Sequence, residues 1–270
     1  MVVDRRRSAC CINVPESWSQ ARAWGKIPPM SGAPMIDVRG LTRRFGDAVA
    51  VQDLDLQVAR GEVFGFLGPN GAGKTTTIQM LCGLLRPSSG SMAIGGVNWQ
   101  ADPDSVRRLF AFAPDTPPLY EYLTVAEYCD FVASLYGVTV SDRVDGLLEQ
   151  LDLLDRRDHL CKSLSHGMRK KAHLAAILGI APPLLVLDEP TNGLDPQGTR
   201  RFKDLIMNLR DQGTTVFLST HVLDVVEEVC DRIGVLQKGR LLALGTVDEL
   251  RRDGGESLEQ LFLQLTSGAH

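Results

Sequence analysis

The chain has 270 residues, of which 44% are apolar and 23% are charged, and this ordinary globular composition excludes collagen-like and low-complexity proteins. Its 29 basic and 33 acidic residues give a formal net charge of −4, which provides no overall basic surface for nucleic acid. The longest apolar stretch, 174–187, contains two prolines and is shorter than the ~20 residues that span a bilayer. We therefore expect a globular protein that does not cross a membrane by itself and does not bind nucleic acid.

Residues 1–34 show no sustained apolar period and contain three consecutive arginines and four prolines. A segment of this kind buries too little apolar surface to fold alone, so we expect a disordered extension, with the first regular segment beginning at Met35. The six cysteines of the chain include no C-x-x-C pair, which indicates reduced thiols rather than a metal or disulfide framework.

From Met35 onwards, the pattern predicts strands separated by helices. Strands are expected at 36–38, 54–58 and 62–67, the last being a compact apolar run that is followed by a glycine. A helix should follow over 74–85, and 91–94 with the two glycines after it suggests a hairpin. These segments predict a small antiparallel β part near the N-terminus.

Residues from about 100 to 165 are predicted to be mainly helical. Thr124 and Glu127 form a capping-box pattern, in which a hydroxyl and a carboxylate bind the free backbone N–H groups at a helix start. Apolar residues then recur at spacings of three and four up to Tyr136, and Gly137 ends the helix. We expect a helical subdomain inserted into an α/β core.

The core pattern returns with continuous apolar runs at 184–187, 214–218 and 233–236. Such runs are typical of strands buried in a parallel sheet, and with helices between them they predict a doubly wound α/β fold. Residues 247–265 are expected to be helical, so that 251–270 would form a C-terminal helical tail.

A glycine-rich segment lies between the strand at 62–67 and the helix at 74 and matches G-x-x-x-x-G-K-[ST]. In this motif, backbone N–H groups and a helix N-terminus surround a phosphate, the lysine adds a point charge, and the last residue binds Mg²⁺. An ordinary glycine-rich turn is the alternative, but the flanking strand and helix favour a P-loop NTPase core. The residues expected to contact the nucleotide are Gly68, Pro69, Asn70, Gly71, Ala72, Gly73, Lys74, Thr75 and Thr76, with Thr75 also a metal ligand.

Two carboxylates, Asp188 and Glu189, follow the apolar run 184–187. Ligands bind at the carboxyl ends of the strands in such sheets, so we expect Asp188 to meet Mg²⁺ and Glu189 to face the terminal phosphate. An exposed strand end is the alternative, although burying two neighbouring carboxylates for structure alone would be costly.

Together these motifs resemble those of the ATP-binding cassette (ABC) ATPases. The family places a signature of the type LSGGQ ahead of the strand that ends in Asp188, and here the similar segment has its serine 23 residues before that aspartate. The resemblance covers about 35–250, which we expect to form one ABC ATPase domain. Its further parts are 164–168 for the signature, 193–195 for the D-loop, His221 for the switch histidine and Phe45 for the aromatic residue under the adenine.

The resemblance implies a dimer, either a homodimer or a paralogous heterodimer, in which two nucleotide-binding domains enclose two ATP molecules. Each ATP would be held by the P-loop of one subunit and by Ser165, Gly167 and Asp195 of the other. The resemblance also implies that Glu189 is the general base for the attacking water and that His221 contacts the γ-phosphate.

Three positions depart from the family pattern. Asp115 stands where the family has a glutamine, and His166 and Met168 replace the usual glycine and glutamine of the signature. A divalent cation would offset the repulsion between a carboxylate and a γ-phosphate, so we expect Asp115 to act through Mg²⁺ or a metal-bound water. The alternative is that Asp115 is a solvated turn residue.

The implied function is that of the ATP-binding and ATP-hydrolysing subunit of an exporter-type ABC transporter, which powers an integral membrane permease on another chain. The protein would be cytoplasmic and peripheral on the cytoplasmic face of the cell membrane, with Tyr120, Tyr122 and Leu123 docking the permease. Two alternatives are a soluble ABC ATPase that acts on DNA, ribosomes or iron–sulfur assembly, and a regulatory module without hydrolysis. The presence of Glu189 and His221 disfavours the second of these.

Overall fold

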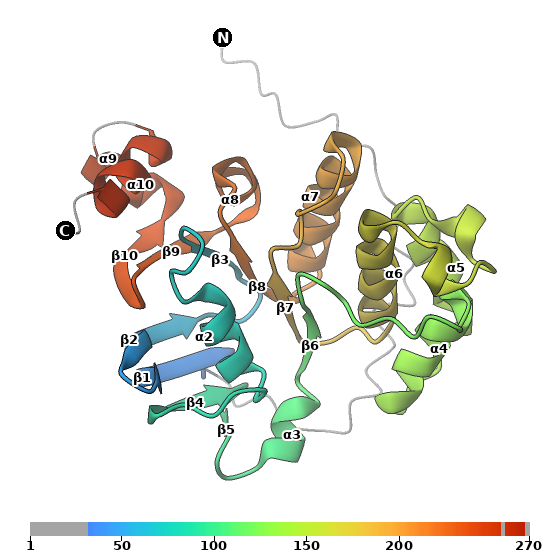
Figure 1. The fold of residues 1–270 in the computed structure, drawn as a ribbon, viewed down its shortest axis with the longest axis horizontal. Helices are drawn as coiled ribbons and strands as arrows, with labels where there is room; N and C mark the ends of the chain where they lie inside the picture. The colour runs from blue at the N-terminus through green and yellow to red at the C-terminus, as the bar shows by residue number, and fades with distance from the viewer. Residues whose placement is uncertain (1–31, 255–256, 268–270) are drawn as a thin grey trace.

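Two β-sheets with helices between and around them make up the described part of the chain (Figure 1). The computed structural model describes residues 32–254 and 257–267, so the expectations for residues 1–31 lie outside the described residues. No helix in these two ranges is long and apolar enough to span a membrane. The strands are β1 (Ile36–Phe45), β2 (Ala48–Val58), β3 (Val63–Leu67), β4 (Ser89–Ile94), β5 (Val97–Asn98), β6 (Phe110–Ala113), β7 (Leu184–Asp188), β8 (Thr215–Thr220), β9 (Arg232–Gln237) and β10 (Arg240–Thr246). The helices are α2 (Lys74–Leu81), α3 (Pro103–Arg107), α4 (Val125–Leu135), α5 (Ser141–Gln150), the short η1 (Leu154–Arg156) and η2 (Cys161–Ser163), α6 (His166–Gly179), α7 (Pro196–Asp211), α8 (Leu223–Val229), α9 (Val247–Gly254) and α10 (Leu258–Ser267).

The smaller sheet is antiparallel, with the strand order β2-β1-β4-β5, as expected for the N-terminal part. Strands β1 and β2 have 10 and 11 residues, whereas the apolar pattern alone predicts only 36–38 and 54–58. The remaining parts of the strands carry exposed polar residues such as Arg44 and Asp53. One face of an antiparallel sheet can be exposed to solvent, so these parts lack the apolar pattern that identifies the buried segments.

The larger sheet has the strand order β10-β9-β3-β8-β7-β6, in which five strands are parallel and β10 is antiparallel at one edge. Strands β3, β7 and β8 are buried along their whole length, as their apolar runs predict. Because these strands are parallel, their carboxyl ends meet at one edge of the sheet. This edge carries the loops that begin at Gly68, Glu189 and His221.

Strand β6 is absent from the sequence prediction and lies inside the range of about 100–165 predicted to be helical. It pairs in parallel with β7, from Phe110 with Leu184 to Ala113 with Leu187. Four residues in which Phe and Ala alternate are too few for their period to distinguish a strand from a helix. The helices of the insert therefore follow an edge strand of the core sheet.

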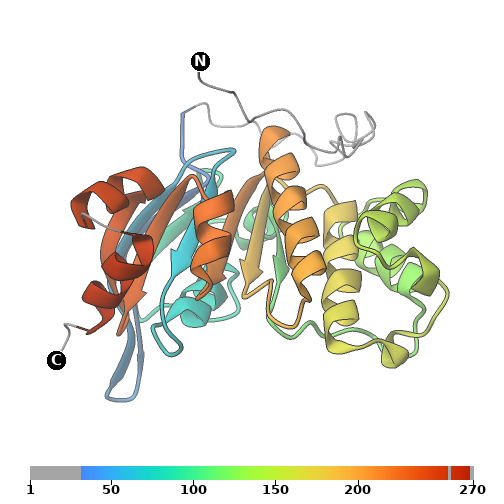
Figure 2. The same cartoon turned by 90° about the horizontal axis from the view of Figure 1, so that it is seen from above.

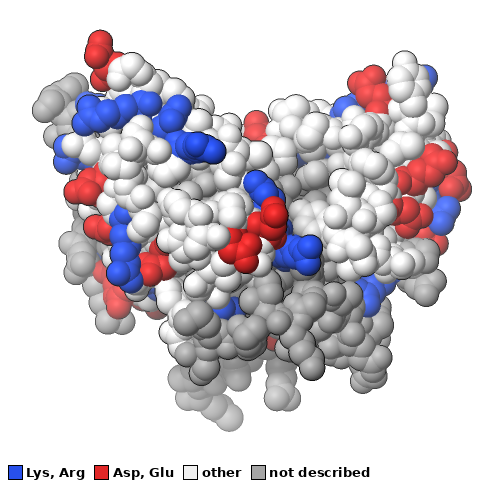
Figure 3. Space-filling model, turned by 90° about the horizontal axis from the view of Figure 1, so that it is seen from below, with Lys and Arg blue, Asp and Glu red and all other residues white. Residues whose placement is uncertain are grey.

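Helices cover both faces of the larger sheet. Helix α2 lies between the two sheets, where its Ile78, Met80 and Leu81 are fully buried. Helices α6, α7 and α8 cover the other face (Figure 2). Seen from below, the molecule has two lobes with a hollow between them, and both basic and acidic side chains lie on the face shown (Figure 3). One lobe lies on the side of the smaller sheet and the other on the side of the helical insert.

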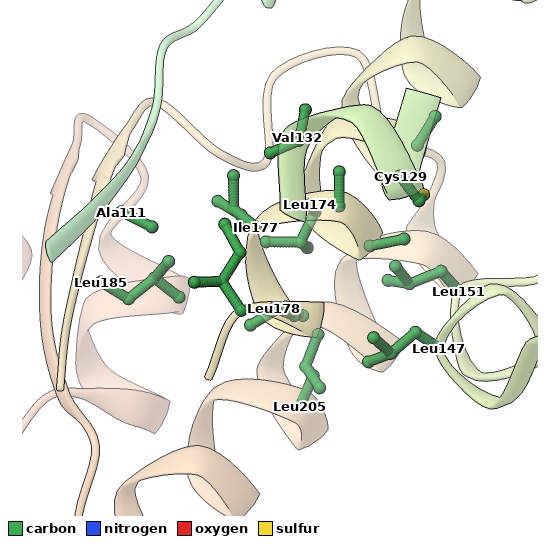
Figure 4. Close-up of a cluster of buried hydrophobic side chains, with 14 of the residues drawn as sticks. Ala111, Cys129, Val132, Leu147, Leu151, Leu174, Ile177, Leu178, Leu185 and Leu205 are labelled. Atoms are coloured by element: carbon green, nitrogen blue, oxygen red, sulfur yellow. The ribbon is translucent and has the colours of Figure 1, made fainter. Parts of the chain in front are cut away.

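Helix α6 joins the insert to the core. Its Leu174, Ile177 and Leu178 lie in one buried cluster with side chains from α4, α5, α7 and strands β6 and β7 (Figure 4). Helix α4 begins at the predicted capping box, which is present: the N–H of Thr124 donates to Glu127 at 2.8 Å and the N–H of Glu127 donates to Thr124 at 3.2 Å. The position of α6 is therefore set by both parts of the molecule at once.

The end of the described chain forms two helices, α9 and α10, where the sequence predicts one helical segment over 247–265. Leu250 and Leu258 are buried in a cluster with side chains of β3, α8 and β9. The side-chain amide of Gln237, at the end of β9, donates a hydrogen bond of 2.6 Å to the carbonyl of Thr266 in α10. The C-terminal helices are thus packed onto the core sheet beside β9.

His173 connects three elements inside the protein. Its ring nitrogens lie 2.7 Å from the hydroxyl of Tyr128 in α4 and 3.1 Å from the carbonyl oxygen of Phe112 in β6. Burial lowers the pKa of the His173 imidazole from its ordinary value, because the charged form would lose its hydration. The side chain is therefore neutral at pH 7 and joins α6 to the insert and to the edge strand.

We expect the stability of this part of the fold to depend on His173 below pH 6.5. The unfolded chain takes up this proton at the ordinary pKa of about 6.5 and the folded chain does not, so the contribution is complete above that pH and falls as the pH is lowered. For one proton the slope is at most about 1.4 kcal/mol per pH unit. His173→Gln should therefore flatten the fall in melting temperature between pH 7.5 and pH 5.5. His159→Gln, at an exposed position, should keep the wild-type slope, and an unchanged slope in His173→Gln would contradict the assignment.

Candidate active site

The P-loop runs from the end of β3 to the start of α2, as predicted. Gly71 and Gly73 have φ angles of 79° and 106°, a left-handed conformation that lets successive N–H groups curl around an anion. A Cβ atom at Gly73 would lie 2.5 Å from the carbonyl oxygen of Ala50, and one at Gly68 would collide with that of Leu236. The loop is thus backed closely by neighbouring backbone, and only glycine fits at these positions.

Lys74 places its ammonium group between the P-loop and the end of β7. The side chain is buried, and Nζ donates to the carbonyl oxygens of Gly68 at 2.6 Å and Pro69 at 3.2 Å. Nζ also lies 3.2 Å from Oε1 of Glu189, a charge contact without hydrogen-bond geometry. A positive charge and a carboxylate therefore meet between the P-loop and the end of β7.

Glu189 has an unusual backbone conformation, with a φ angle of 47° that few residues other than glycine adopt. Its N–H donates to the carbonyl oxygen of Ser219 at 3.1 Å and to the hydroxyl of that residue at 3.2 Å. Nδ1 of His221 lies 3.0 Å from Oε2 of Glu189 in a hydrogen bond. The two residues predicted to be catalytic are therefore in direct contact, and only 8% of Glu189 is exposed.

The side-chain oxygen atoms of Asp188 and Thr75 are suitable ligands for a magnesium ion. Asp188 ends β7, is buried, and accepts a hydrogen bond of 2.5 Å from the hydroxyl of Ser219. Thr75 is exposed in the first turn of α2. Carboxylate and hydroxyl oxygens fit Mg²⁺, which binds through few protein ligands and substrate phosphates.

The signature segment and the D-loop contact each other. Ser165 is the N-cap of α6, and a Cβ atom at Gly167 would lie 2.7 Å from the carbonyl oxygen of Gly193. The ring of His166, which replaces a glycine of the family pattern, lies against Gly193. The ring has room there because Gly193 has no side chain. Asp195 is the N-cap of α7 and accepts a hydrogen bond from the N–H of Gly198 at 2.9 Å.

The exposed Ser165 and Asp195 are not brought to the P-loop of the same chain. Among residues 32–254 and 257–267, no hydrogen bond or ion pair joins Ser165, Gly167 or Asp195 to residues 68–75. Their contact with the nucleotide of a partner subunit stays a prediction.

Phe45, predicted to lie under the adenine, is half-exposed at the end of β1. The guanidinium of Arg43 lies 4.4 Å from the centre of its ring, and Arg43 also donates a hydrogen bond of 2.8 Å to the carbonyl oxygen of Arg86. Arg43 thereby fixes the ring from one side. Stacking of adenine on Phe45 stays a prediction.

Asp115 lies after β6, and its neighbours were not identified from the sequence. Its Oδ1 accepts hydrogen bonds from Nζ of Lys170 at 2.6 Å and from the side-chain amide of Asn192 at 3.3 Å. Lys170 precedes His173, Leu174 and Ile177 by three, four and seven residues, and this helical period could have identified it as a buried lysine. The contact of Asp115 with a metal stays a prediction.

Comparison with known proteins identifies the family of this chain. The sequence pattern of the ABC transporter family matches residues 51–192, just over half of the chain. The daunorubicin/doxorubicin resistance ATP-binding protein DrrA of Streptomyces peucetius is 40% identical over 231 residues, which cover 84% of this chain and 70% of that protein. A structure of an ATP-binding subunit of an ABC transporter has a TM-score of 0.81 and 34% identity, covering 86% of this chain and 99% of that chain. A dimeric post-hydrolysis structure of the ATP-binding cassette MJ0796 with ADP and phosphate is similar in fold, with a TM-score of 0.72 and 24% identity over 78% of this chain and 98% of that chain.

Proposed function

Because this chain belongs to the ABC transporter family, and is an ATP-binding ATPase of that family, we propose that it powers export through a membrane-spanning subunit on another polypeptide. The observation that carries the proposal is the meeting of Lys74, Glu189 and His221 at the end of the core sheet. Binding alone would not require a buried carboxylate paired with a histidine beside the P-loop lysine.

The site residues have distinct roles in the proposed reaction. The P-loop binds the phosphates of ATP through its backbone, and Phe45 stacks on the adenine. Thr75 and Asp188 would hold Mg²⁺, and the ion would neutralise charge on the phosphates. Glu189 takes a proton from the attacking water at its carboxylate, and His221 holds that carboxylate and contacts the γ-phosphate.

A second copy of the chain or a paralogue completes each site. The supporting observation is that Ser165 and Asp195 are exposed N-caps of helices α6 and α7 and are not joined to the P-loop of their own chain. The N-terminus of a helix favours an anion, so these residues suit the γ-phosphate bound by a partner.

The protein is proposed to lie at the cytoplasmic face of the membrane, with the membrane subunit docked near the segment between β6 and α4. Tyr120 and Tyr122 support this assignment because they are 58% and 78% exposed, which is unusual for large aromatic side chains. Leu123 is partly buried against the insert core, so its side chain supports the loop more than it offers a contact.

Tyr122→Ser should reduce recovery of the protein with membranes several-fold, because it removes an exposed aromatic anchor from the docking surface. The chain would be co-expressed with a candidate membrane subunit, and the membrane-bound fraction measured by sedimentation. Leu263→Ser removes a similarly exposed apolar side chain, 52% exposed, from α10 and is the matched control. Equal recovery of the wild type and Tyr122→Ser would contradict the docking assignment.

The cargo is proposed to be an organic molecule of the kind named for DrrA of Streptomyces peucetius, the daunorubicin/doxorubicin resistance ATP-binding protein. Inverted vesicles that carry this chain and its membrane protein should accumulate daunorubicin when ATP is added, and vesicles with Glu189→Gln should not. A chain that stays away from membranes and sediments with ribosomes or DNA would instead support the non-membrane alternative.

A further inference from the structure

We infer that Lys170 is a positioning residue for ATP hydrolysis, which holds the backbone of Glu189 and is itself held by Asp115. Nζ of Lys170 donates to the carbonyl oxygen of Glu189 at 3.0 Å and to Oδ1 of Asp115 at 2.6 Å. Lys170 is 7% exposed, so these contacts replace the hydration of its charge. The inference rests on the proposed role of Glu189 in hydrolysis.

The backbone of Glu189 needs support on both sides. Its φ angle of 47° lies in the left-handed region, and such a conformation persists only where surrounding groups hold it. Ser219 accepts a hydrogen bond from the N–H of Glu189. The carbonyl oxygen of Glu189 accepts hydrogen bonds from Nζ of Lys170 and from the N–H of Asn192, which is 3.2 Å away. A rotation of this backbone would turn the carboxylate away from Lys74 and His221.

Asp115 gives the ammonium group of Lys170 a fixed location. A buried cation without a partner is costly, and a carboxylate at 2.6 Å compensates for the lost water. The same Oδ1 atom also accepts from the side chain of Asn192, three residues after Glu189. One carboxylate oxygen therefore joins the segment after β6, helix α6 and the loop after β7.

This arrangement gives Asp115 a role that a neutral glutamine would not fill. Two donors engage its Oδ1 atom, and the charge of Lys170 offsets its own. Asp115 then reaches the site of hydrolysis through Lys170 and the Glu189 backbone, and not as a metal ligand. The charge suits the buried lysine, which explains a carboxylate at this position.

Lys170→Met keeps the length of the side chain and removes its charge and donors. We expect kcat to fall on the order of tenfold, while KM for ATP changes less than twofold, because the P-loop is untouched. Lys171→Met is the matched control and should retain wild-type kcat, since the ammonium of Lys171 pairs with Asp152, at 3.9 Å, on the surface of the insert and away from Glu189. Hydrogen exchange adds a readout independent of turnover: the amide of Asn192 should exchange faster in Lys170→Met and not in Lys171→Met.

Asp115→Asn tests the contact between Asp115 and Lys170, because an amide oxygen still accepts a hydrogen bond from Lys170 without carrying a charge. Its kcat should fall about threefold, and Lys170→Met with Asp115→Asn should be no slower than Lys170→Met alone, since both act through one contact. Independent, multiplying effects would overturn the inference, and melting temperatures would show whether either variant is merely unfolded.

A Mg²⁺ titration separates this role from metal binding. The Mg²⁺ concentration for half-maximal turnover should be the same in Asp115→Asn and the wild type, and a raised midpoint would assign Asp115 to the metal and overturn the inference. Unchanged kcat in Lys170→Met, with Glu189→Gln inactive, would also overturn it and leave the proposed function intact. Absence of ATPase activity in the wild type would contradict the proposed function itself.

Discussion

Glu189→Gln should lower ATP turnover on the order of 10²-fold or more while leaving ATP binding intact. The amide keeps the size of the carboxylate and can still contact Lys74 and His221, but it cannot accept the proton of the attacking water. Hydrolysis is then blocked after assembly, so ATP should hold the variant as a dimer. Phosphate release, nucleotide binding and size-exclusion chromatography with ATP measure these three effects.

The matched control is Glu149→Gln, which makes the same chemical change at an exposed position on α5. It should retain wild-type turnover. Turnover of Glu189→Gln within a few-fold of the wild type would remove Glu189 from the role of general base, whatever the variant does to dimerisation.

Ser165→Arg should abolish both dimerisation and turnover while leaving ATP binding to the P-loop of each subunit intact. Ser165 is an exposed helix N-cap, so a large cation there would fill the space proposed for the γ-phosphate of the partner's ATP. Ser165→Ala removes only the cap, which typically contributes about 1 kcal/mol, and separates that loss from the steric effect. Ser134→Arg adds the same side chain at an exposed position on α4 and should assemble normally.

A mixing experiment tests whether the site is shared between subunits. A dimer of Ser165→Arg with Lys74→Ala contains one site with an intact P-loop and an intact signature, and one site with both defects. Activity should return in the mixture, although each variant is inactive alone. A mixture with no activity would count against a site shared in this way.

The central part of the fold could be predicted because its signals are local. The P-loop combines fixed residue types with a strand before it and a helix after it, and β7 is a continuous apolar run that ends in Asp188 and is followed by Glu189. The capping box at Thr124 is equally local. These features need no knowledge of distant contacts, which is why the sequence alone identifies them.

The missed features depend on neighbours that are distant in sequence. Strand β6 becomes recognisable only when it pairs with β7, and its four residues carry no period of their own. Lys170 looks like one of three consecutive basic residues, yet it alone among them is buried, because the end of β7 and the segment after β6 meet it. The location of Asp115 follows from the same contact and not from its place in a motif.

Helix α6 has a consequence for the energetics of the proposed cycle. Its N-cap is Ser165, the residue proposed to meet a partner, and five residues later Lys170 contacts the backbone of Glu189. If association with a partner changes the affinity of the site at Glu189 for nucleotide through this helix, thermodynamic linkage requires that nucleotide binding changes the affinity for the partner by the same free energy. Nucleotide binding then multiplies the association constant of the dimer by a certain factor. Dimer association multiplies the affinity for nucleotide by the same factor. One coupling free energy, transmitted by helix α6, would thus describe both the effect of assembly on ATP binding and the effect of ATP binding on assembly.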